Sequence, residues 1–406
     1  MNILIFSHVK IYPADAGSRV RIYNFTNQLK KMGHKIHFVH YAKSSTDKIY
    51  YDFMQKNYAS FNLIVQKKKT ALKEGNYVLD EWYEDTIHLN INEMVERYNI
   101  DMVLTNYIFH SKFLEYLPKN VYKVIDTHDR FTDRYKLFSD KKSVKYTWHS
   151  YSQKDEAKAL NRADLIISIT DEENRFFSSI CKKEVITIGH IENKKELNIS
   201  YEKLKKIGFI GGVNQVNVVS INDFLEEFYN SSKNTQNIKI VIAGVICKSI
   251  KFKHENIELL GLVDELEEFY KSVDLVINPL MFGTGQKIKS IEALSYGVPI
   301  LSTKIGFEGI YSDSEFHRIG SLKEMVQSID TIVEKPKHLI NLAKKSKEVF
   351  TSYKTPLNSA IESIFTNKKN TEILKAVEAI TKISFFKHPL QKYKLYKNIL
   401  KAYYAK

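Results

Sequence analysis

Short apolar segments alternate with amphipathic ones along most of the chain. In the first half, this pattern predicts strands at residues 2–7, 35–40, 101–105, 121–126, 164–169 and 184–188. Residues 164–169 are almost continuously apolar, as is typical of a strand buried on both faces of a parallel sheet. A helix is predicted at 17–32, before Gly33, and another after Thr170, whose spacing to Glu173 is that of a capping box.

The alternation restarts after a polar segment without periodicity, residues 192–200. Strands are then predicted at 206–210, 238–243, 257–260, 274–278 and 298–302, with helices at 221–229, 264–272 and 287–296. Two doubly wound α/β units follow from this order. We therefore predict an α/β protein with Rossmann-like domains at 1–190 and 205–365, joined by a linker at 191–204. The carboxyl ends of the two parallel sheets are expected to face a central cleft, where ligands of such folds bind.

The last segment, 366–406, has a different character. It carries ten Lys but only Glu372 and Glu378 as acidic residues, and six aromatic residues are interleaved. Tyr393, Tyr396 and Tyr403 fall on one helical face and lysines on another. This basic, aromatic helical tail fits an interfacial helix on an anionic membrane surface, or a C-terminal helix packed on the core. Both interpretations remain open.

Composition narrows the functional classes. The chain has 61 Lys and Arg against 47 Asp and Glu, a formal net charge of +14 that favours an anionic partner. No nucleic-acid-binding module is recognisable, so nucleic acid is not expected. Two cysteines in 406 residues do not form a disulfide framework. No targeting segment and no run of ~18 apolar residues is present. We expect a cytoplasmic protein, peripheral at the inner membrane face if the tail binds lipid.

The segment 278–294 carries the strongest chemical signal. It follows a strand, contains Gly283 and Gly285, and opens a helix whose free amide groups suit a phosphate. Lys287 and Lys289 add positive charge, and the Glu292 carboxylate can accept a ribose diol. The segment is neither a dinucleotide fingerprint nor a P-loop, because the required small residue and Gly-Lys-Ser/Thr are absent. The predicted donor-binding residues are Gly211, Gly212, Gly283, Thr284, Gly285, Gln286, Lys287, Lys289 and Glu292.

A family resemblance rests on these residues. Residues 261–309, GLVDELEEFYKSVDLVINPLMFGTGQKIKSIEALSYGVPILSTKIGFEG, are similar to the C-terminal domain of family 4 glycosyltransferases (glycosyl transferases group 1), which have the GT-B fold. Weaker resemblance covers residues 2–40, 164–173 and 207–217. The resemblance implies a nucleotide-sugar donor, UDP- or GDP-sugar, on the second domain and an acceptor on the first. It also implies that Glu292 holds the ribose and that residues 283–285 surround the diphosphate and sugar.

The chain departs from the family pattern at three positions. Thr284 stands where the pattern has the first Glu of Glu-x7-Glu, and Gly212 and Asn217 stand where it has an Arg and a Lys. A departing nucleoside diphosphate develops negative charge, so another cation should stabilise it. Lys287 and Lys289 are candidates in a GTG-x-K-x-K loop. The other candidates, Arg19 and Arg21, follow Gly17 in a loop expected to face the cleft.

A second group of candidates lies at the end of the strand 121–126. His128 titrates near neutral pH, and Asp126 or Asp129 can orient it or act as a base. A capped turn is the alternative interpretation, and a metal site lacks ligand spacing. The predicted catalytic residues are His128, Asp129, Asp126, Lys287 and Arg19. The predicted acceptor-binding residues are Gly17, Arg19, Arg21 and His8, with His190 and Glu156 as minor candidates.

Together these features predict a hexosyltransferase-type enzyme that moves a sugar from a nucleotide-sugar to a saccharide or lipid-linked acceptor. Cell-envelope polysaccharide, lipooligosaccharide or capsule synthesis is the expected setting. No metal or other cofactor is expected, because Lys and Arg can neutralise the diphosphate. Two alternatives stay open: a sugar-nucleotide epimerase of the same fold, and a non-catalytic partner subunit resembling a glycosyltransferase.

Overall fold

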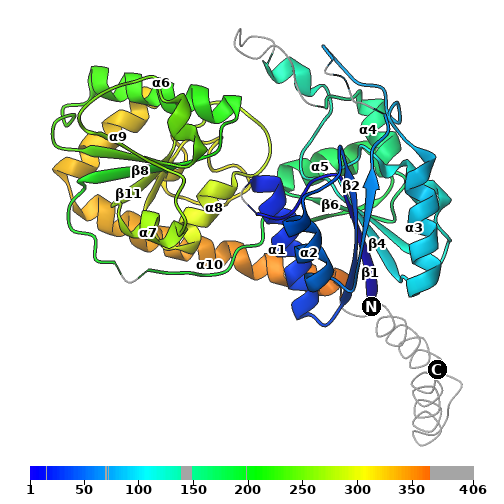
Figure 1. Cartoon of the computed structure of the whole chain (residues 1–406). Helices are drawn as coiled ribbons and strands as arrows, with labels where there is room; N and C mark the ends of the chain where they lie inside the picture. Colours follow the sequence, from blue (N-terminus) through cyan, green and yellow to red (C-terminus); the bar gives the residue numbers. More distant parts are fainter. Residues whose placement is uncertain (15, 69–70, 72, 139–148, 198, 366–406) are drawn as a thin grey trace, which may run out of the picture. The chain divides into compact units, whose positions relative to one another are not determined.

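Two separate parallel sheets organise the computed structural model (Figure 1). The structure describes residues 1–14, 16–68, 71, 73–138, 149–197 and 199–365. Within these ranges, all pairings between the named strands are parallel. Both sheets lie in one compact unit, Met1–Leu357. The predicted α/β fold class with two Rossmann-like domains is confirmed. The predicted tail at 366–406, with its membrane contact, lies outside the described residues.

The first sheet has seven strands in the order β3-β2-β1-β4-β5-β6-β7. Its strands are β1 (Asn2–Ser7), β2 (Lys35–Ala42), β3 (Ser60–Val65), β4 (Met102–Asn106), β5 (Tyr122–Asp126), β6 (Leu165–Ser168) and β7 (Glu184–Thr187). Its helices are α1 (Gly17–Lys31), α2 (Lys48–Asn57), α3 (Asp85–Tyr98), α4 (Gln153–Leu160) and α5 (Asp171–Ile180). The strand order reverses between β1 and β4, which places a crevice at their carboxyl ends.

The second sheet has five strands in the order β10-β9-β8-β11-β12, and its order reverses between β8 and β11. The strands are β8 (Lys206–Ile210), β9 (Lys239–Ala243), β10 (Ile257–Gly261), β11 (Leu275–Asn278) and β12 (Ile300–Ser302). The helices are α6 (Gln215–Ser231), α7 (Leu266–Lys271), α8 (Ile288–Ser295), α9 (Leu322–Glu334) and α10 (Lys337–Phe365).

Side-chain alternation along β9 shows why helices cover both faces of the second sheet. Ile240 and Ile242 pack with residues of α6 and α9, whereas Val241 and Ala243 pack with residues of α7 and α8. Successive side chains of a strand point to opposite faces, so an almost wholly apolar strand needs a helical layer on each side. β1 follows the same rule, since Ile3 through Phe6 are completely buried.

The structure contains elements that the apolar pattern did not predict, among them β3 and α2. It also begins α6 six residues before the predicted helix, because Asn214 caps it: the Asn214 side chain accepts a hydrogen bond from the Asn217 amide at 2.8 Å. Within the described ranges, no helix has the length and apolar character needed to cross a bilayer.

Candidate active site

Arg21 of α1 ties the end of β5 to the segment after β7. Its guanidinium donates to both carboxylate oxygens of Asp126, at 2.9 and 2.6 Å, and to the carbonyl oxygens of Ile188 and Gly189, at 3.0 and 2.9 Å. Arg21 and Asp126 are both buried. In the structure, Asp126 and Arg21 thus form a buried ion pair, and the roles predicted for them stay predictions.

His128 lies directly after β5 in a left-handed conformation, with φ +63°. Its ring stacks on Tyr107, which follows β4 and is also left-handed at φ +69°, with ring centroids 4.1 Å apart. Left-handed backbone is costly for non-glycine residues and marks positions that the surrounding structure holds firmly. Two such residues stacked at the ends of neighbouring strands form a rigid wall of the site.

Asn106 fixes the proton on the His128 ring. The Asn106 amide nitrogen donates to the Phe6 carbonyl oxygen at 3.0 Å, so its oxygen faces His128 Nε2 at 2.8 Å as an acceptor. Nε2 therefore carries the hydrogen and Nδ1 carries the lone pair. Burial lowers the pKa of His128 to about 4; Asp126 opposes this shift and Arg21 adds to it. His128 is neutral at physiological pH and accepts hydrogen bonds through Nδ1.

The glycine loop before α8 lies against two other segments. Gly285 has φ +74°, and a Cβ there would be 3.3 Å from Ile169 Cδ1 and 3.4 Å from Asp129 Oδ1. Gly283 has φ +115°, and its Cβ would be 3.5 Å from Val216 Cγ1 in α6. Positive φ and close neighbours explain why glycine occupies both positions.

Thr284 connects this loop to the His128 segment. Its hydroxyl donates to Asp129 Oδ2 at 3.1 Å, and the same oxygen lies 3.0 Å from the Arg134 guanidinium. Asp129 Oδ1 accepts from the Arg130 amide at 2.9 Å. Asp129, a predicted catalytic residue, thus already has partners on both oxygens and holds the loop.

Lys289 is a partly buried cation between the amino ends of α6 and α8. Its ammonium lies 2.6 Å from the Asn217 side-chain oxygen and 4.5 Å from the centre of the Phe209 ring. Burial lowers the pKa of Lys289 to about 7; Lys287 adds to the shift and Glu292 opposes it. Residue 217 is the position at which the family pattern has a lysine. Lys289 brings an ammonium to that place from a different helix.

Glu292 lies one turn further along α8. Its Oε1 accepts from the Tyr270 hydroxyl at 2.8 Å, and burial raises its pKa. Among the described residues, Oε2 has no hydrogen-bond partner. The carboxylate therefore has a free acceptor, as binding of a diol requires.

The side chains of Lys287 and Gln286 bond to the glycine loop and to the backbone next to it. The Lys287 ammonium donates to the carbonyl oxygens of Thr284, at 2.8 Å, and Gly285, and lies 3.1 Å from Glu308. Lys287 is the residue preceding α8, so its side chain folds back over the loop. The Gln286 amide bridges the His190 amide, at 2.6 Å, and the carbonyl oxygen of Gly309, at 3.0 Å. Both side chains thus bond to the loop and its surroundings in this structure, and their predicted role in donor binding stays a prediction.

Arg19, His8 and Glu156 do not line the site. Arg19 lies two residues after Gly17, about 200° round the helix, and its guanidinium is 3.5 Å from the Pro13 carbonyl oxygen. His8 packs against aromatic rings, with its centroid 4.9 Å from that of Tyr107. The buried Glu156 carboxylate accepts from the amide of residue 131 and from the Thr132 hydroxyl, so it clamps a loop.

Gly211 and Gly212 follow β8 and lie near α6. A Cβ at Gly211 would be 3.3 Å from the Phe209 ring, whereas one at Gly212 would meet nothing within 4 Å. Gly212 thus borders open space. The Asn217 side-chain nitrogen donates to its carbonyl oxygen at 3.0 Å, which fixes this turn beside Lys289.

A cavity of about 330 Å³, here the site cavity, brings predicted residues of both domains together. Its lining is Gly17, Ser18, Arg21, Tyr107, His128, Asp129, Ile169, His190, Asn214, Thr284, Gly285, Gln286 and Ile288. The sequence analysis did not predict Tyr107, Ser18 and Asn214 as site residues. It also did not predict Asn106, which contacts the His128 ring without lining the cavity. Asn106 and Tyr107 had a usable signal, because β4 lies beside the strand-order reversal and its carboxyl end faces the crevice. Among the described residues, no group of three His, Cys, Asp or Glu could hold a metal.

Comparisons with known proteins give one family match. Residues 204–335 match the family model described as "Glycosyl transferases group 1". No curated protein sequence matches the chain.

Solved structures show the same fold at low sequence identity. Staphylococcus aureus TarM, in complex with Fondaparinux, alpha-GlcNAc-glycerol and UDP, has 11% identity and a TM-score of 0.66 over 90% of this chain and 100% of that one. Anabaena HepE, with UDP and glucose, has 11% identity and a TM-score of 0.63 over 90% and 100%. Sucrose-phosphate synthase of Thermosynechococcus elongatus has 12% identity and a TM-score of 0.61 over 93% and 99%. The chain therefore has the GT-B fold, and its residues 204–335 are similar to the glycosyl transferases group 1 family.

Proposed function

We propose that the protein transfers a hexosyl group from a nucleotide-sugar to a saccharide or lipid-linked acceptor. The nucleotide binds the second domain and the acceptor binds the first. The family match and two relatives whose structures contain UDP support a UDP- or GDP-sugar donor. Synthesis of cell-envelope polysaccharide, lipooligosaccharide or capsule is the proposed setting.

The position of Lys289 is the observation that carries this proposal. Its partly buried ammonium lies beside the Asn217 side chain in the first turn of α6 and near the ring of Phe209 in β8, and Lys289 itself belongs to the first turn of α8. The first turn of α8 contains no acidic residue and no side chain caps it. Free amides, helix dipoles and an ammonium together favour a diphosphate. A partly buried cation with so few protein partners is costly unless an anion joins it.

The remaining groups of the second domain have matching roles. Glu292 Oε2 accepts the ribose hydroxyls, and the 283–285 loop lies against the diphosphate and sugar. Transfer breaks the bond between the anomeric carbon and the diphosphate oxygen, which leaves with the electron pair. The acceptor's hydroxyl oxygen forms the new bond to that carbon, and its proton passes to the departing diphosphate. Lys289 stabilises the negative charge that develops there. No metal is proposed, because the ammonium and the helix amides supply this stabilisation.

His128 acts on the acceptor side. Its Nδ1 lone pair accepts a hydrogen bond from the attacking hydroxyl and orients that oxygen towards the anomeric carbon. A ring with a pKa of about 4 is a weak base, so orientation is its main contribution. Tyr107 keeps the ring in place by stacking, and Asn106 keeps its tautomer.

Nucleotide binding and transfer test the proposal in sequence. We expect one of UDP, GDP, CDP, ADP and dTDP to raise the unfolding temperature of the full chain, with or without a chelator. At a hundredfold excess over Kd, stabilisation is about 2.7 kcal/mol. The sugar-nucleotide of that base should then release its diphosphate when a saccharide acceptor mixture is added.

Variants identify the responsible groups. Lys289→Met should abolish the nucleotide shift, and adding Asn217→Lys should restore it by supplying the ammonium from the other helix. Lys119→Met, which removes an exposed lysine, is the matched control. No shift with any nucleotide would support a non-catalytic subunit instead. Conversion of the donor sugar without acceptor would identify an epimerase, and rescue only by divalent ions would contradict metal independence.

A further inference from the structure

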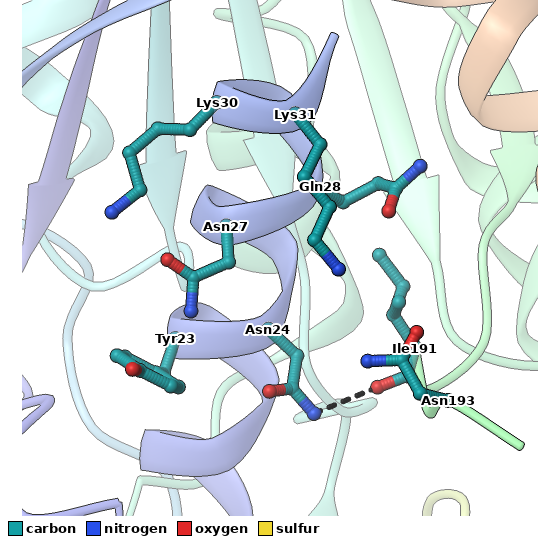
Figure 2. A pocket seen from close by; sticks show the side chains of 8 residues that line it. All are labelled: Tyr23, Asn24, Asn27, Gln28, Lys30, Lys31, Ile191 and Asn193. Carbon is teal, nitrogen blue, oxygen red and sulfur yellow. Dashed lines mark hydrogen bonds between the residues drawn. The ribbon is translucent and has the colours of Figure 1, made fainter.

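A second cavity lies between α1 and the segment that follows β7 (Figure 2). Its volume is about 450 Å³, larger than that of the site cavity. We call it the seam cavity. Its lining is Tyr23, Asn24, Asn27, Gln28, Lys30, Lys31, Ile191 and Asn193. None of these residues belongs to the proposed donor site.

The face of α1 that meets this segment is polar along its whole length. Gly17, Arg21, Asn24, Gln28 and Lys31 are spaced by four, three, four and three residues, which places them on one stripe of the helix. A stripe packed against another chain segment is usually apolar. Here Gly17 and Arg21 line the site cavity, whereas the last three residues line the seam cavity.

The two cavities are neighbours along the same seam. His190 lines the site cavity, and Ile191, the next residue in the chain, lines the seam cavity. Between them, the Asn24 amide donates to the Ile191 carbonyl oxygen at 2.8 Å (Figure 2). From Gly17 to Gln28 the helix rises about 16 Å. A chain of a few sugar rings can span that distance from the reacting end.

The seam cavity offers hydrogen bonds that no described residue uses. Within the described part of the chain, the side-chain amides of Asn27 and Gln28 and the Lys31 ammonium make no hydrogen bond, and each borders the cavity. An amide both donates and accepts, as a sugar hydroxyl does. Tyr23 adds an aromatic ring beside them (Figure 2).

The charge of the lining is entirely positive. Lys30 and Lys31 contribute two ammonium groups, and none of the eight lining residues is acidic. Burial lowers the pKa of Lys30, whose ammonium lies 5.0 Å over the Tyr58 ring and donates to the Asn57 carbonyl oxygen at 3.4 Å but has no carboxylate partner among the described residues. A cation partly withdrawn from water gains from an anionic partner. The carboxamides favour a polyhydroxylated ligand over a lipid surface, which would need exposed apolar side chains.

We propose that the seam cavity binds the distal part of an anionic oligosaccharide acceptor, such as one that carries carboxylates. The inference rests on the proposed function, since the site cavity then holds the acceptor's reacting end. Carboxylates of the acceptor pair with Lys30 and Lys31, and its hydroxyls bond with Asn27 and Gln28.

Titration calorimetry of the full chain at fixed ionic strength tests this proposal. The probes are tetragalacturonate, which is anionic, and maltotetraose, which is neutral. We expect tetragalacturonate to bind at least about tenfold more tightly. Lys31→Ala and Gln28→Ala should each weaken it by about tenfold, because each removes a hydrogen-bonding or charged contact. Lys119→Ala, the same charge change at an exposed position outside the cavity, should leave the affinity within about twofold.

Several results would overturn the assignment. One is that tetragalacturonate does not bind, and another is that maltotetraose binds with the same affinity. A third is that Lys31→Ala and Lys119→Ala change the affinity for tetragalacturonate by the same factor. The last is that inorganic polyphosphate binds as tightly as tetragalacturonate and is weakened by the same variants. The nucleotide thermal shift on the same proteins separates the two proposals. If no nucleotide raises the unfolding temperature of the unmodified chain while tetragalacturonate still binds at the seam cavity, the donor assignment alone would be wrong.

Discussion

The partly buried ammonium of Lys289 should destabilise the protein in a way that depends on pH. Burial lowers its pKa from the ordinary 10.5 to about 7, so the unfolded chain binds one more proton than the folded chain between these values. Where the unfolded state binds more protons, stability rises with pH. The cost of burying this lysine is therefore full below pH 7 and disappears as the pH approaches 10.5.

The magnitude follows from the same two values. Each tenfold difference in proton affinity corresponds to about 1.4 kcal/mol, so the cost is about 5 kcal/mol at pH 6 and about 2 kcal/mol at pH 9. Lys289→Met keeps the length of the side chain and removes the charge. Its free energy of unfolding should exceed that of the unmodified chain, and this excess should shrink by about 3 kcal/mol between pH 6 and pH 9.

Urea unfolding followed by circular dichroism, at pH 6, 7, 8 and 9, measures this change. The pH-dependent part is diagnostic, because packing effects of the methionine are the same at every pH. Lys119→Met, at an exposed position, should show no such trend. A difference between Lys289→Met and the unmodified chain that stays constant from pH 6 to pH 9 would refute the reasoning. Nucleotide binding at pH 8 should also take up close to one proton, read from calorimetry in two buffers.

Three further perturbations follow from the site geometry. His128→Ala should lower kcat about a hundredfold. Because the pKa of His128 is about 4, the NMR signals of its ring should show no titration between pH 5.5 and pH 8 in the unmodified protein; titration near pH 6.5 would contradict its neutral state. Arg21→Met leaves the Asp126 carboxylate buried and unpaired, so denaturant unfolding should show a loss of about 3–5 kcal/mol, and a loss under 1 kcal/mol would mean that water reaches it. Gly285→Ala should weaken nucleotide binding at least about tenfold in the thermal-shift titration, because φ at this position is +74° and alanine strains the loop. Gly212→Ala, at a position that borders open space, should leave nucleotide binding unchanged. Equal losses of affinity in the two variants would show that the loop is not part of the nucleotide site.

Much of the fold could be predicted because several strands, among them β1, β6 and β11, are apolar runs ended by a polar residue. β1 and β8 have the predicted bounds, and β5 differs by one residue. β3 was not predicted, because Ser60 and Asn62 interrupt its apolar pattern at an edge of the sheet. The start of α6 depends on the Asn214 cap, a single side-chain hydrogen bond that hydrophobic periodicity does not report.

The sequence was enough to predict where the candidate site lies, but it was not enough to predict what each of its side chains contacts. The loop between β11 and α8 was found from its glycines, but the division of work between Lys287 and Lys289 depends on direction. Lys287 precedes the helix and turns back over the loop, whereas Lys289 lies in the first turn and points towards α6. Arg19 and Arg21 differ in the same way. Side chains two positions apart in a helix point to nearly opposite faces. The nearness of both arginines to Gly17 in the sequence does not show which of them lies on the buried face.

The Gln286 amide has a consequence for how the two substrates affect each other. One side chain holds the glycine loop to the His190 amide and to the Gly309 carbonyl oxygen, while the Tyr353 hydroxyl donates to the same Gln286 oxygen at 3.0 Å. If a bound donor draws the loop towards its phosphates, these bonds loosen, and the change reaches His190, which borders the site cavity, and Ile191, which borders the seam cavity. Binding of the nucleotide and binding of the saccharide are then thermodynamically linked, and such linkage is reciprocal. The factor by which bound nucleotide changes the affinity for a saccharide must equal the factor by which that saccharide changes the affinity for nucleotide.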